Sequence, residues 1–522
     1  MSRVAWRAGD PRVYAAVESA LAGAAPHAAL RVLHDNPRRR LLRVESDRGA
    51  LLAKHFKTAS GRHAARERVK RWLGQSPASR EWRHLVHARA AGAPVPEPLA
   101  LGRLPEGDEI LVTRFVEGEL LADALRVEAP ARRERLRAVG RAVAKLHAAG
   151  LEHRDLHAGN VLVGSVGATL LDLQHARRRR GEAARARDLG QLDYSLWRLA
   201  SASDRLRLAS AALGLDRHRT ASDRERLRTV ARAARARADA HARSRTRRAL
   251  HEGRLHARAR VDDFKGLRLR DLDACDLEAA LAAHREALGA ALLEADARSR
   301  VSAVRAGERA AIVKEYPARG LARAIADAVR GSPARRGWRA GHGLLARGIG
   351  AAQPLAYLER RVLGVPVRSF FVMEDVRPAS DALAAVHEKP ADALDALVRL
   401  VVALHRRGVD HGDLKATNVF LRGGPRGLDP LLVDLEGVRF RRALGEARRV
   451  QALAELNASL PDVFPAELRR AAFARYARAH PFAEGSASAL RRVVEASLAR
   501  RHRFQGKGCA IQSSGPRPSA AP

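Results

Sequence analysis

Residues 153–163 read HRDLHAGNVLV, an acidic residue and an amide five positions apart, followed by a short apolar run. Residues 411–421 read HGDLKATNVFL, the same pattern 258 positions later, counted from Asp155 to Asp413 (413 − 155). In both places apolar residues at helical spacing precede the pattern, so we expect a helix, a loop and a strand in that order. One chain that carries this arrangement twice indicates two copies of one fold.

The similarity extends through both halves of the chain. Ser76–Leu101 (SPASREWRHLVHARAAGAPVPEPLAL) matches Ser332–Tyr357 (SPARRGWRAGHGLLARGIGAAQPLAY) over the same length. The 522 residues also exceed the size of one ordinary core, because single cores stop growing near about 250 to 300 residues. We therefore place a first domain at 1–256, a second at 257–505, and a tail at 506–522 that lacks apolar periodicity and is expected to be disordered.

The first half offers the groups that phosphoryl transfer from ATP requires. These are a carboxylate that accepts a hydroxyl proton, ligands for Mg²⁺, and a cation on the nucleotide phosphates. Asp155 is the candidate catalytic base, and Asn160 in the same loop is a candidate metal ligand. Asp172 ends the next predicted strand in TLLDL, where it is placed to bind Mg²⁺ on the phosphates. ATP and Mg²⁺ are the expected cofactors.

Two residues upstream complete the expected nucleotide site. Lys54 follows a strand-like run in LLAKHFK and is the candidate phosphate-binding cation, with Lys57 as its competitor. Glu81, on a predicted helix in SREWRHL, is placed to pair with Lys54. Each residue by itself would be read as a solvated side chain. Their order and their repetition favour a nucleotide site, and the chain has only nine lysines, so a lysine at such a position carries weight.

The second half carries the counterparts, with some departures. The candidates are Asp413 as the catalytic base and, for the nucleotide and its metal, Lys314, Lys415, Asn418 and Asp434, of which Asn418 and Asp434 are the metal-ligand candidates. Gly337 stands where the first half has Glu81, so Lys314 lacks an evident partner and catalysis there is in doubt. Ala452 aligns with Asp188, which we expect to brace the first catalytic loop from the following helix. Both an active and a degenerate second domain stay open.

A glycine-rich phosphate loop is missing from the pattern. Neither half has GxGxxG before its lysine; the first has HDNPRRRLLRV and the second ARSRVSAVR. We expect that Arg38 to Arg40 cover the phosphates with side chains in place of backbone amides.

Together these motifs resemble the bacterial lipopolysaccharide kinase family, over roughly residues 30 to 200 and 298 to 510. The segments that carry the resemblance include NPRRRLLRV before AKHFK, SREWRHLVHARAAGAPVPEPLA, EHRDLHAGNVLV, LLDLQHARR and RDLGQLDYSL. The resemblance implies two tandem protein-kinase-like bilobal domains of α+β class, each with a small antiparallel N-lobe and a helical C-lobe. It also implies phosphorylation of Kdo or heptose in the lipopolysaccharide inner core, at the inner face of the inner membrane.

Other readings of the motifs stay open at this point. An aminoglycoside- or choline-type small-molecule kinase shares the HGDL-x-x-x-N pattern, and a Ser/Thr protein kinase is a third candidate. A non-catalytic basic scaffold of two inactive kinase folds is the alternative from another class. Retention of Asp155, Asn160 and Asp172 speaks against a scaffold, because a scaffold needs none of them.

Composition bounds the partners and the location. Lys and Arg number 96 against 58 Asp and Glu, a net charge of +38, which suits an anionic glycolipid or the inner leaflet of a membrane. We expect no nucleic-acid partner. Two cysteines fit a reducing cytoplasm, and neither a signal peptide nor an apolar run of spanning length is present. The expectation is a cytoplasmic protein with peripheral membrane contact.

Overall fold

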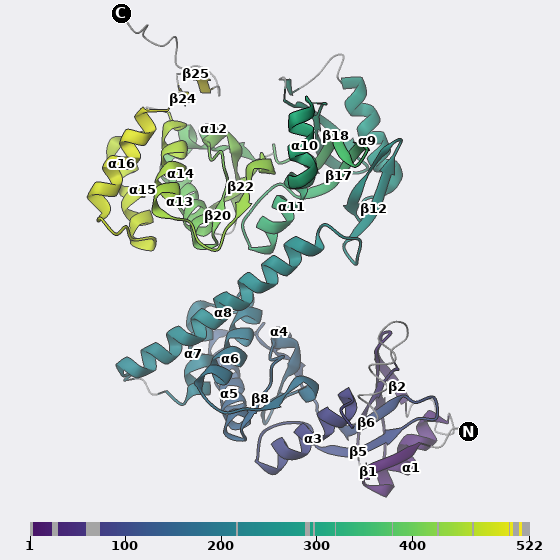
Figure 1. Ribbon diagram of the computed structural model, residues 1–522. Helices are drawn as coiled ribbons and strands as arrows, with labels where there is room; N and C mark the ends of the chain where they lie inside the picture. The colour runs from purple at the N-terminus through teal and green to yellow at the C-terminus, as the bar shows by residue number, and fades with distance from the viewer. Residues whose placement is uncertain are drawn as a thin grey trace, which may run out of the picture. The chain divides into compact units, whose positions relative to one another are not determined.

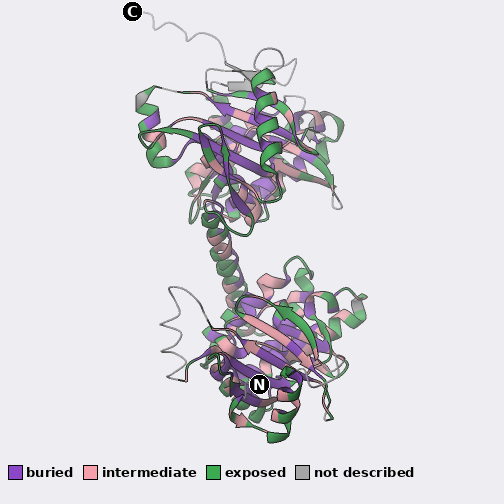
Figure 2. Ribbon diagram, turned by 90° about the vertical axis from the view of Figure 1, so that its right-hand side faces the viewer, coloured by how far each residue is buried: buried purple, intermediate pink, exposed green. Residues whose placement is uncertain are grey.

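The structure is a computed structural model in which the chain forms two compact units, Met1–Ala238 and Asp239–Pro522. The residues that it describes are 4–22, 30–47, 49–58, 74–215, 218–287, 293–295, 298–318, 320–377, 379–424, 427–461, 464–500, 502–504 and 511–513. In each unit an antiparallel sheet precedes a mainly helical lobe (Figure 1). The central strands of each sheet are largely buried, whereas the strand at residues 30–35, at the edge of the first sheet, is mostly exposed (Figure 2).

The first unit starts with a six-stranded antiparallel sheet in the order β1, β5, β6, β4, β3, β2. Its strands are β1 (Ala5–Gly9), β2 (Leu30–Asp35), β3 (Arg39–Val44), β4 (Leu51–Phe56), β5 (Pro98–Arg103) and β6 (Glu109–Arg114). The helices that pack against it are α1 (Pro11–Leu21) and α3 (Pro77–Ala90).

Strand alternation on β4 decides where the predicted lysine points. Ala53 belongs to a core cluster that includes Val17 of α1. Phe56 belongs to a second cluster, with Leu85 of α3. Successive side chains of a strand point to opposite faces of the sheet, so Lys54 shares the face of Phe56. The lysine therefore faces α3.

The second lobe of the first unit is helical, with short strands beside its loops. The helices are α4 (Leu121–Ala124), α5 (Ala129–Ala148), α6 (Glu182–Leu196), α7 (Ala202–Leu213) and α8 (Ala221–Arg248), and α8 extends past the end of the unit at Ala238. The strands are β7 (Glu119–Leu120), β8 (Leu151–Glu152), β9 (Val161–Gly164), β10 (Gly167–Leu170) and β11 (Arg177–Arg178).

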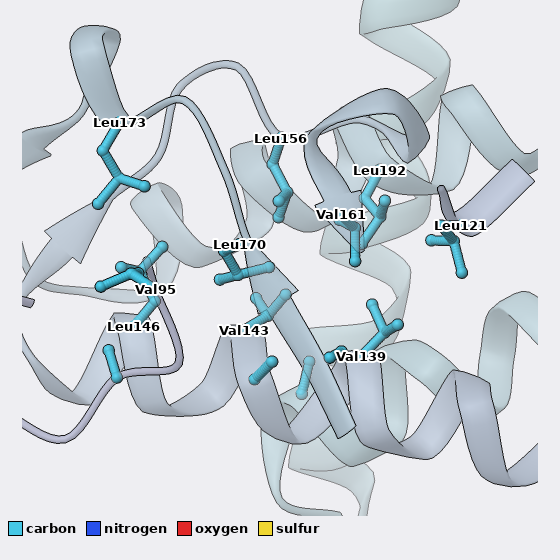
Figure 3. Close-up of a cluster of buried hydrophobic side chains, with 14 of the residues drawn as sticks. Val95, Leu121, Val139, Val143, Leu146, Leu156, Val161, Leu170, Leu173 and Leu192 are labelled. Carbon is cyan, nitrogen blue, oxygen red and sulfur yellow. The ribbon is translucent and has the colours of Figure 1, made fainter. Parts of the chain in front are cut away.

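One continuous apolar core supports the loops of this lobe. The apolar row expected on α5 is fully buried and consists of Leu136, Val139, Val143 and Leu146. These side chains gather with Leu156, Val161 and Leu170 (Figure 3). Leu156 lies within the HRDLHAGN segment and Val161 directly follows it, and Leu170 precedes Asp172 by two residues. The core therefore fixes both acidic segments against one helix.

The second unit repeats this plan with a seven-stranded sheet in the order β12, β13, β17, β18, β16, β15, β14. Its strands are β12 (His256–Val261), β13 (Phe264–Leu269), β14 (Glu294–Ala295), β15 (Arg300–Ala306), β16 (Arg309–Tyr316), β17 (Pro354–Val362) and β18 (Val365–Glu374). The helices of this lobe are α9 (Ala274–Ala287), α10 (Leu321–Arg330) and α11 (Pro333–Ala346).

The helical lobe of the second unit also matches the expectation. Its helices are α12 (Ala382–Glu388), α13 (Pro390–Arg406), α14 (Glu446–Ala458), α15 (Ala466–Ala479) and α16 (Ser486–Leu498). Its short strands are β19 (Ser380–Asp381), β20 (Val409–Asp410), β21 (Val419–Gly424), β22 (Gly427–Leu432), β23 (Arg439–Phe440), β24 (His502–Phe504) and β25 (Ile511–Ser513). The predicted row on α13 is buried and consists of Leu394, Leu397, Val401 and Leu404.

The predicted α+β class with two tandem bilobal units is confirmed. The compact units divide at Ala238, inside α8, whereas the sequence division at 256 falls at the first strand of the second sheet. Of the tail predicted at 506–522, only Ile511–Ser513 lies among the described residues, where it pairs with β24. In the described part of the chain, no helix has the length and apolar character needed to cross a bilayer.

Candidate active site

In the first unit, β4 and α3 present a buried ion pair to each other. Lys54 Nζ lies 2.5 Å from Glu81 Oε1, and the two side chains are 7% and 1% exposed. The start of α3 is fixed by Ser76, whose side chain accepts a hydrogen bond from Ser79 N, followed by a proline in the first turn. This helix start fixes which turn carries Glu81. The two residues that the sequence paired are therefore in contact.

The HRDLHAGN segment is held by one carboxylate from α6. Asp188 Oδ2 accepts hydrogen bonds from His153 N at 2.7 Å and His147 Nε2 at 3.0 Å, and Asp188 Oδ1 accepts one from Arg154 N at 2.8 Å. Arg154 adopts the left-handed conformation at φ 67°, which a non-glycine residue rarely adopts. Asp188 is buried, so its bonds compensate for a strained turn. These contacts agree with the bracing role expected from the sequence.

His153 links the loop to the strand that leads to Asp172. Its Nδ1 accepts a hydrogen bond from Asp155 N at 3.3 Å, so its Nε2 carries the proton and donates to Leu171 O at 2.9 Å. Burial lowers the pKa of His153, which keeps the ring neutral in this arrangement. Leu171 N in turn donates to Asn160 O at 2.9 Å. The ring of His153 therefore has a structural role in the loop.

Asp155 is oriented by a residue that the sequence analysis missed. Gln191 Nε2 on α6 donates to Asp155 Oδ1 at 2.9 Å, which leaves Oδ2 toward solvent with His157 Nε2 at 3.9 Å. The side chain of Asp155 is 37% exposed, so an acceptor hydroxyl can reach it. Asn160 Nδ2 donates to Asp155 O at 2.9 Å, and this fixes its amide oxygen on the other side. The base and the candidate metal ligand are thus held by one loop.

Asp172 contacts an arginine of the β2–β3 hairpin. Arg39 Nη1 donates to Asp172 Oδ2 at 3.0 Å. The hairpin turn is closed by Asn36, whose Oδ1 accepts from the backbone nitrogens of Arg38 and Arg39 at 2.8 Å each. Lys57, the competitor of Lys54, instead pairs with Asp35 of β2 at 2.5 Å. The arginine-bearing turn therefore lies over Asp172, and Lys57 points to the outer edge of the sheet.

The charges of this site act on one another. Burial by itself raises the pKa of Asp172, but the charges of Lys54 and Arg39 outweigh it, so the pKa lies below its usual value. Burial raises the pKa of Glu81, and the charge of Lys54 acts in the opposite direction. Asp172 adopts the left-handed conformation at φ 62°, which turns its carboxylate away from the strand direction. Lys54, Glu81 and Asp172 therefore face one another across the lobes of the first unit.

In the second unit Lys314 has two carboxylate partners that were not predicted from the sequence. Lys314 Nζ lies 2.5 Å from Asp434 Oδ1 and 3.0 Å from Glu436 Oε1. The expectation that Lys314 lacks a partner is therefore wrong. It considered only the α11 position, Gly337, whereas the partner comes from the short helical turn after Asp434. Burial by itself lowers the pKa of Lys314, but the charges of Glu436 and Asp434 outweigh it and raise the pKa.

The loop of the second unit keeps the geometry of the first with a different brace. Asn418 Nδ2 donates to Asp413 O at 2.9 Å, and Lys415 Nζ lies 2.8 Å from Asp413 Oδ2. Ala452 cannot brace the loop as Asp188 does. Glu455, one turn later on α14, accepts from Leu414 N at 3.2 Å instead. The carboxylate that supports the loop therefore lies one turn later on its helix in the second unit than in the first.

The structure thus brings the predicted residues together in two clusters, one in each unit. The first contains Lys54, Glu81, Asp155, Asn160 and Asp172; the second contains Lys314, Asp413, Lys415, Asn418 and Asp434. Three contacting residues were not assigned from the sequence: Gln191, Glu436 and Glu455. The alignment of the two halves could have indicated these residues. It pairs Gln174 with Glu436 and Gln191 with Glu455, so a neutral amide in the first half corresponds to an acid in the second.

The residues of the first unit fit a metal-bound nucleotide. Asp172 Oδ1 is buried and has no hydrogen-bond partner among the described residues. A carboxylate oxygen of this kind suits Mg²⁺, which keeps water and phosphate ligands beside one or two protein groups. In the described segments, no three His, Cys, Asp or Glu side chains cluster into a protein-only metal cage. Lys54 and Arg39 supply the cations that phosphates need.

An apolar cavity in the second unit lies apart from both clusters. It has a volume of about 470 Å³ and lies among α13, α14, α15 and α16. Its lining includes Leu397, Leu456 and Phe473 and none of the residues assigned to phosphate chemistry.

Two of three comparisons with known proteins give a match. The model of the "Lipopolysaccharide kinase (Kdo/WaaP) family" matches residues 27–227 and 294–476. The solved structure "WaaP in complex with acyl carrier protein" is similar at 21% identity, with a TM-score of 0.33, over 40% of this chain and 87% of that chain. A comparison with curated proteins finds no match.

Proposed function

The chain belongs to the lipopolysaccharide kinase (Kdo/WaaP) family, which matches it over two separate regions, and we propose that its first unit phosphorylates a Kdo or heptose sugar of the lipopolysaccharide inner core. Members of this family are kinases of lipopolysaccharide sugars, which implies the use of ATP. The choice of sugar, the division of roles between the units and the use of Mg²⁺ are parts of the proposal.

The observation that carries the proposal is the buried pair of Lys54 and Glu81 beside Asp172. A lysine held by a carboxylate from a helix and facing an acid after the next hairpin is the arrangement that binds nucleotide phosphates in kinase folds. The pair is almost fully buried, and burying two charges costs free energy that a stability role alone seldom recovers. A binding role accounts for the presence of the pair.

The proton of the acceptor hydroxyl goes to Asp155. Its Oδ1 is held by Gln191, so Oδ2 is the oxygen that takes the proton. A base held within hydrogen-bond reach of a hydroxyl typically contributes about a hundredfold to ten-thousandfold in rate. His153 and Asp188 act as positioning residues, because they hold the backbone of Asp155 and its neighbour.

The remaining groups of the first unit bind the nucleotide. Bound ATP supplies the phosphoryl group, and Mg²⁺ offsets the charge of its phosphates. Asp172 Oδ1 and the amide oxygen of Asn160 are the ligands offered to the metal, and Lys54 offers its ammonium group to the phosphates. Arg39, in a hairpin without glycine, would contact the phosphates in place of backbone amides. The chain thereby holds the nucleotide from both lobes of the unit.

A strip of arginines beside the loop supports an anionic acceptor. In β11, Arg177 pairs in register with Glu152 and Arg178 with Leu151, the two residues that precede His153. Arg177 and Arg178 are exposed. Inner-core sugars that carry carboxylates and phosphates would be attracted to this strip, whereas a cationic aminoglycoside or choline would be repelled. The charge pattern therefore favours the glycolipid over the small-molecule alternative.

The direct test is phosphate transfer in vitro. Purified protein, labelled ATP and Mg²⁺ are incubated with lipopolysaccharide core whose phosphates have been removed, and the labelled product is resolved. We expect transfer by the wild type, loss with Asp155→Asn, and wild-type rates with Asp47→Asn, an exposed residue in the turn between β3 and β4. Equal transfer by Asp155→Asn and the wild type would refute the assignment of the first unit.

A further inference from the structure

The two units carry different residues at three corresponding positions around the phosphate-binding lysine, which is Lys54 in the first unit and Lys314 in the second. In the first unit the lysine has Glu81 on α3, Leu111 opposite it on β6, and Gln174 after Asp172. In the second unit the corresponding residues are Gly337 on α11, Phe371 opposite Lys314 on β18, and Glu436 after Asp434. The carboxylate that is lost on the helix reappears on the turn after the metal-binding position.

Phe371 explains why the helix position is glycine. A Cβ atom at Gly337 would lie 3.1 Å from two carbons of the Phe371 ring, which is tighter than ordinary contacts allow. Phe371 is 1% exposed and cannot turn out to solvent. The space that the Glu81 side chain occupies in the first unit is therefore filled by an aromatic ring in the second. A side chain at 337 would require that ring to shift by a few tenths of an ångström.

Glu436 is placed to do what Glu81 does. Its Oε1 lies 3.0 Å from Lys314 Nζ, and the two side chains are 12% and 14% exposed. Its turn is tied to α11 by a hydrogen bond from Arg336 Nε to Glu436 O at 3.3 Å. Lys314 also contacts Asp434 Oδ1, so one ammonium serves two carboxylates. If Asp434 were to hold a metal, Glu436 would remain as a partner of Lys314.

The rest of the nucleotide machinery is intact around this pair. Asp434 has the left-handed backbone of Asp172, with φ 55°. Val433 N donates to Asn418 O at 3.0 Å, as Leu171 N does to Asn160 O. A unit that had only lost its function would have no reason to replace the missing carboxylate from another element. The exchange preserves the lysine pair rather than abolishing it.

We propose that the second unit is a second site for a metal-bound nucleoside triphosphate, in which Glu436 replaces Glu81 as the partner of the phosphate-binding lysine. This inference rests on the proposed nucleotide chemistry of the first unit, but it concerns binding in the second. It assigns Glu436 as a positioning residue, because it acts through Lys314.

The test counts nucleotides bound to the full chain by calorimetry with a non-hydrolysable ATP analogue and Mg²⁺. We expect two per wild-type chain and one per chain with Lys54→Met, the remaining one being in the second unit. Adding Glu436→Gln to Lys54→Met should raise the Kd of that site about tenfold or more, because loss of one carboxylate from a buried ion pair leaves the lysine charge less well compensated. Glu467→Gln, with a side chain 78% exposed, is the matched control and should leave the Kd unchanged.

The outcomes separate this inference from the proposed function. One nucleotide per wild-type chain and none with Lys54→Met would overturn the second site and leave the first unit's activity standing. An unchanged Kd with Glu436→Gln would overturn the role of Glu436. Failure of the wild type to transfer phosphate to core sugar would instead count against the proposed function, whatever the calorimetry gives.

A transplant of the exchange provides an independent variant. Glu81→Gly alone should weaken nucleotide binding at the first site, and Glu81→Gly with Leu111→Phe and Gln174→Glu should recover most of that loss. Thermal melting establishes that both variants are folded. If the triple variant binds no better than Glu81→Gly, the exchange does not preserve the lysine pair and the proposal is wrong. If the triple variant does not fold, the Glu436→Gln comparison decides.

Discussion

Lys54 Nζ lies 2.5 Å from Glu81 Oε1, and both side chains are almost completely buried. Removal of one partner of a buried ion pair typically costs about 3 to 5 kcal/mol, because a charge is left without compensation. We expect Glu81→Ala to lower the melting temperature of the first unit and to raise the KM for ATP. Glu97→Ala removes a carboxylate that is 39% exposed and paired with Arg114, and it should change neither quantity. Unaltered melting and KM in Glu81→Ala would contradict the role given to the pair.

Asp188 should affect turnover more than nucleotide binding. Its carboxylate accepts three hydrogen bonds, two of them from the backbone of the HRD turn. An asparagine in its place offers one acceptor oxygen, so the strained turn at Arg154 loses support. We expect Asp188→Asn to lower kcat by about tenfold or more, as loss of a charged hydrogen bond allows, with little change in the KM for ATP. Steady-state kinetics over a range of ATP concentrations separate the two effects, and a change confined to KM would count against the bracing role.

Arg39 is expected to act on ATP binding. It lies over Asp172 in a hairpin that lacks glycine, where its guanidinium is placed to cover phosphates. We expect Arg39→Ala to raise the KM for ATP and to leave kcat nearly unchanged. Arg114→Ala is the control, since Arg114 is exposed and pairs with Glu97 outside this hairpin. A lower KM in Arg39→Ala would mean that the arginine blocks Asp172 instead of serving the nucleotide.

The lowered pKa of Asp172 makes a prediction about acid stability. A carboxylate whose pKa is lower in the folded state stabilises the fold above its unfolded pKa, near 3.8, and this stabilisation is lost as the pH falls through the lowered folded value. Below about pH 4 we expect the free energy of unfolding of Asp172→Asn to depend less on pH than that of the wild type, because the variant lacks the carboxylate whose protonation differs between the folded and unfolded states. Urea unfolding at a series of acidic pH values measures this. Parallel curves for the two proteins would show that Asp172 gains no charge stabilisation from Lys54 and Arg39.

Much of the architecture was predictable because its determinants are local. The apolar residues on α5 and α13 recur at helical spacing in the sequence, and all of them are buried. The positions of Lys54, Asp155, Asn160 and Asp172 along the chain follow the order that a two-lobed phosphotransferase needs. Their convergence in space then follows from a strand, a loop and a hairpin around one core.

The contacts that escaped prediction depend on side-chain volume and reach across elements. The partners of Lys314, Asp434 and Glu436, lie on the turn after β22, whereas the ring of Phe371 lies against the Gly337 position. The hydrogen bond from Gln191 to Asp155 depends on how α6 is oriented against the catalytic loop. Neither relationship is visible in the spacing of residues within one motif. Only the alignment of the two halves, which pairs Gln174 with Glu436 and Gln191 with Glu455, could have indicated these residues.

The activity of the first unit is tested most directly by the lipopolysaccharide core of living cells. Cells that carry the intact chain are compared with cells in which its only change is Asp155→Asn, and the core oligosaccharides are analysed by mass spectrometry. The account predicts that the variant core lacks one phosphate on an inner-core sugar, with the protein still folded and present at the wild-type level. A core of unchanged mass and phosphate content in the variant would contradict it.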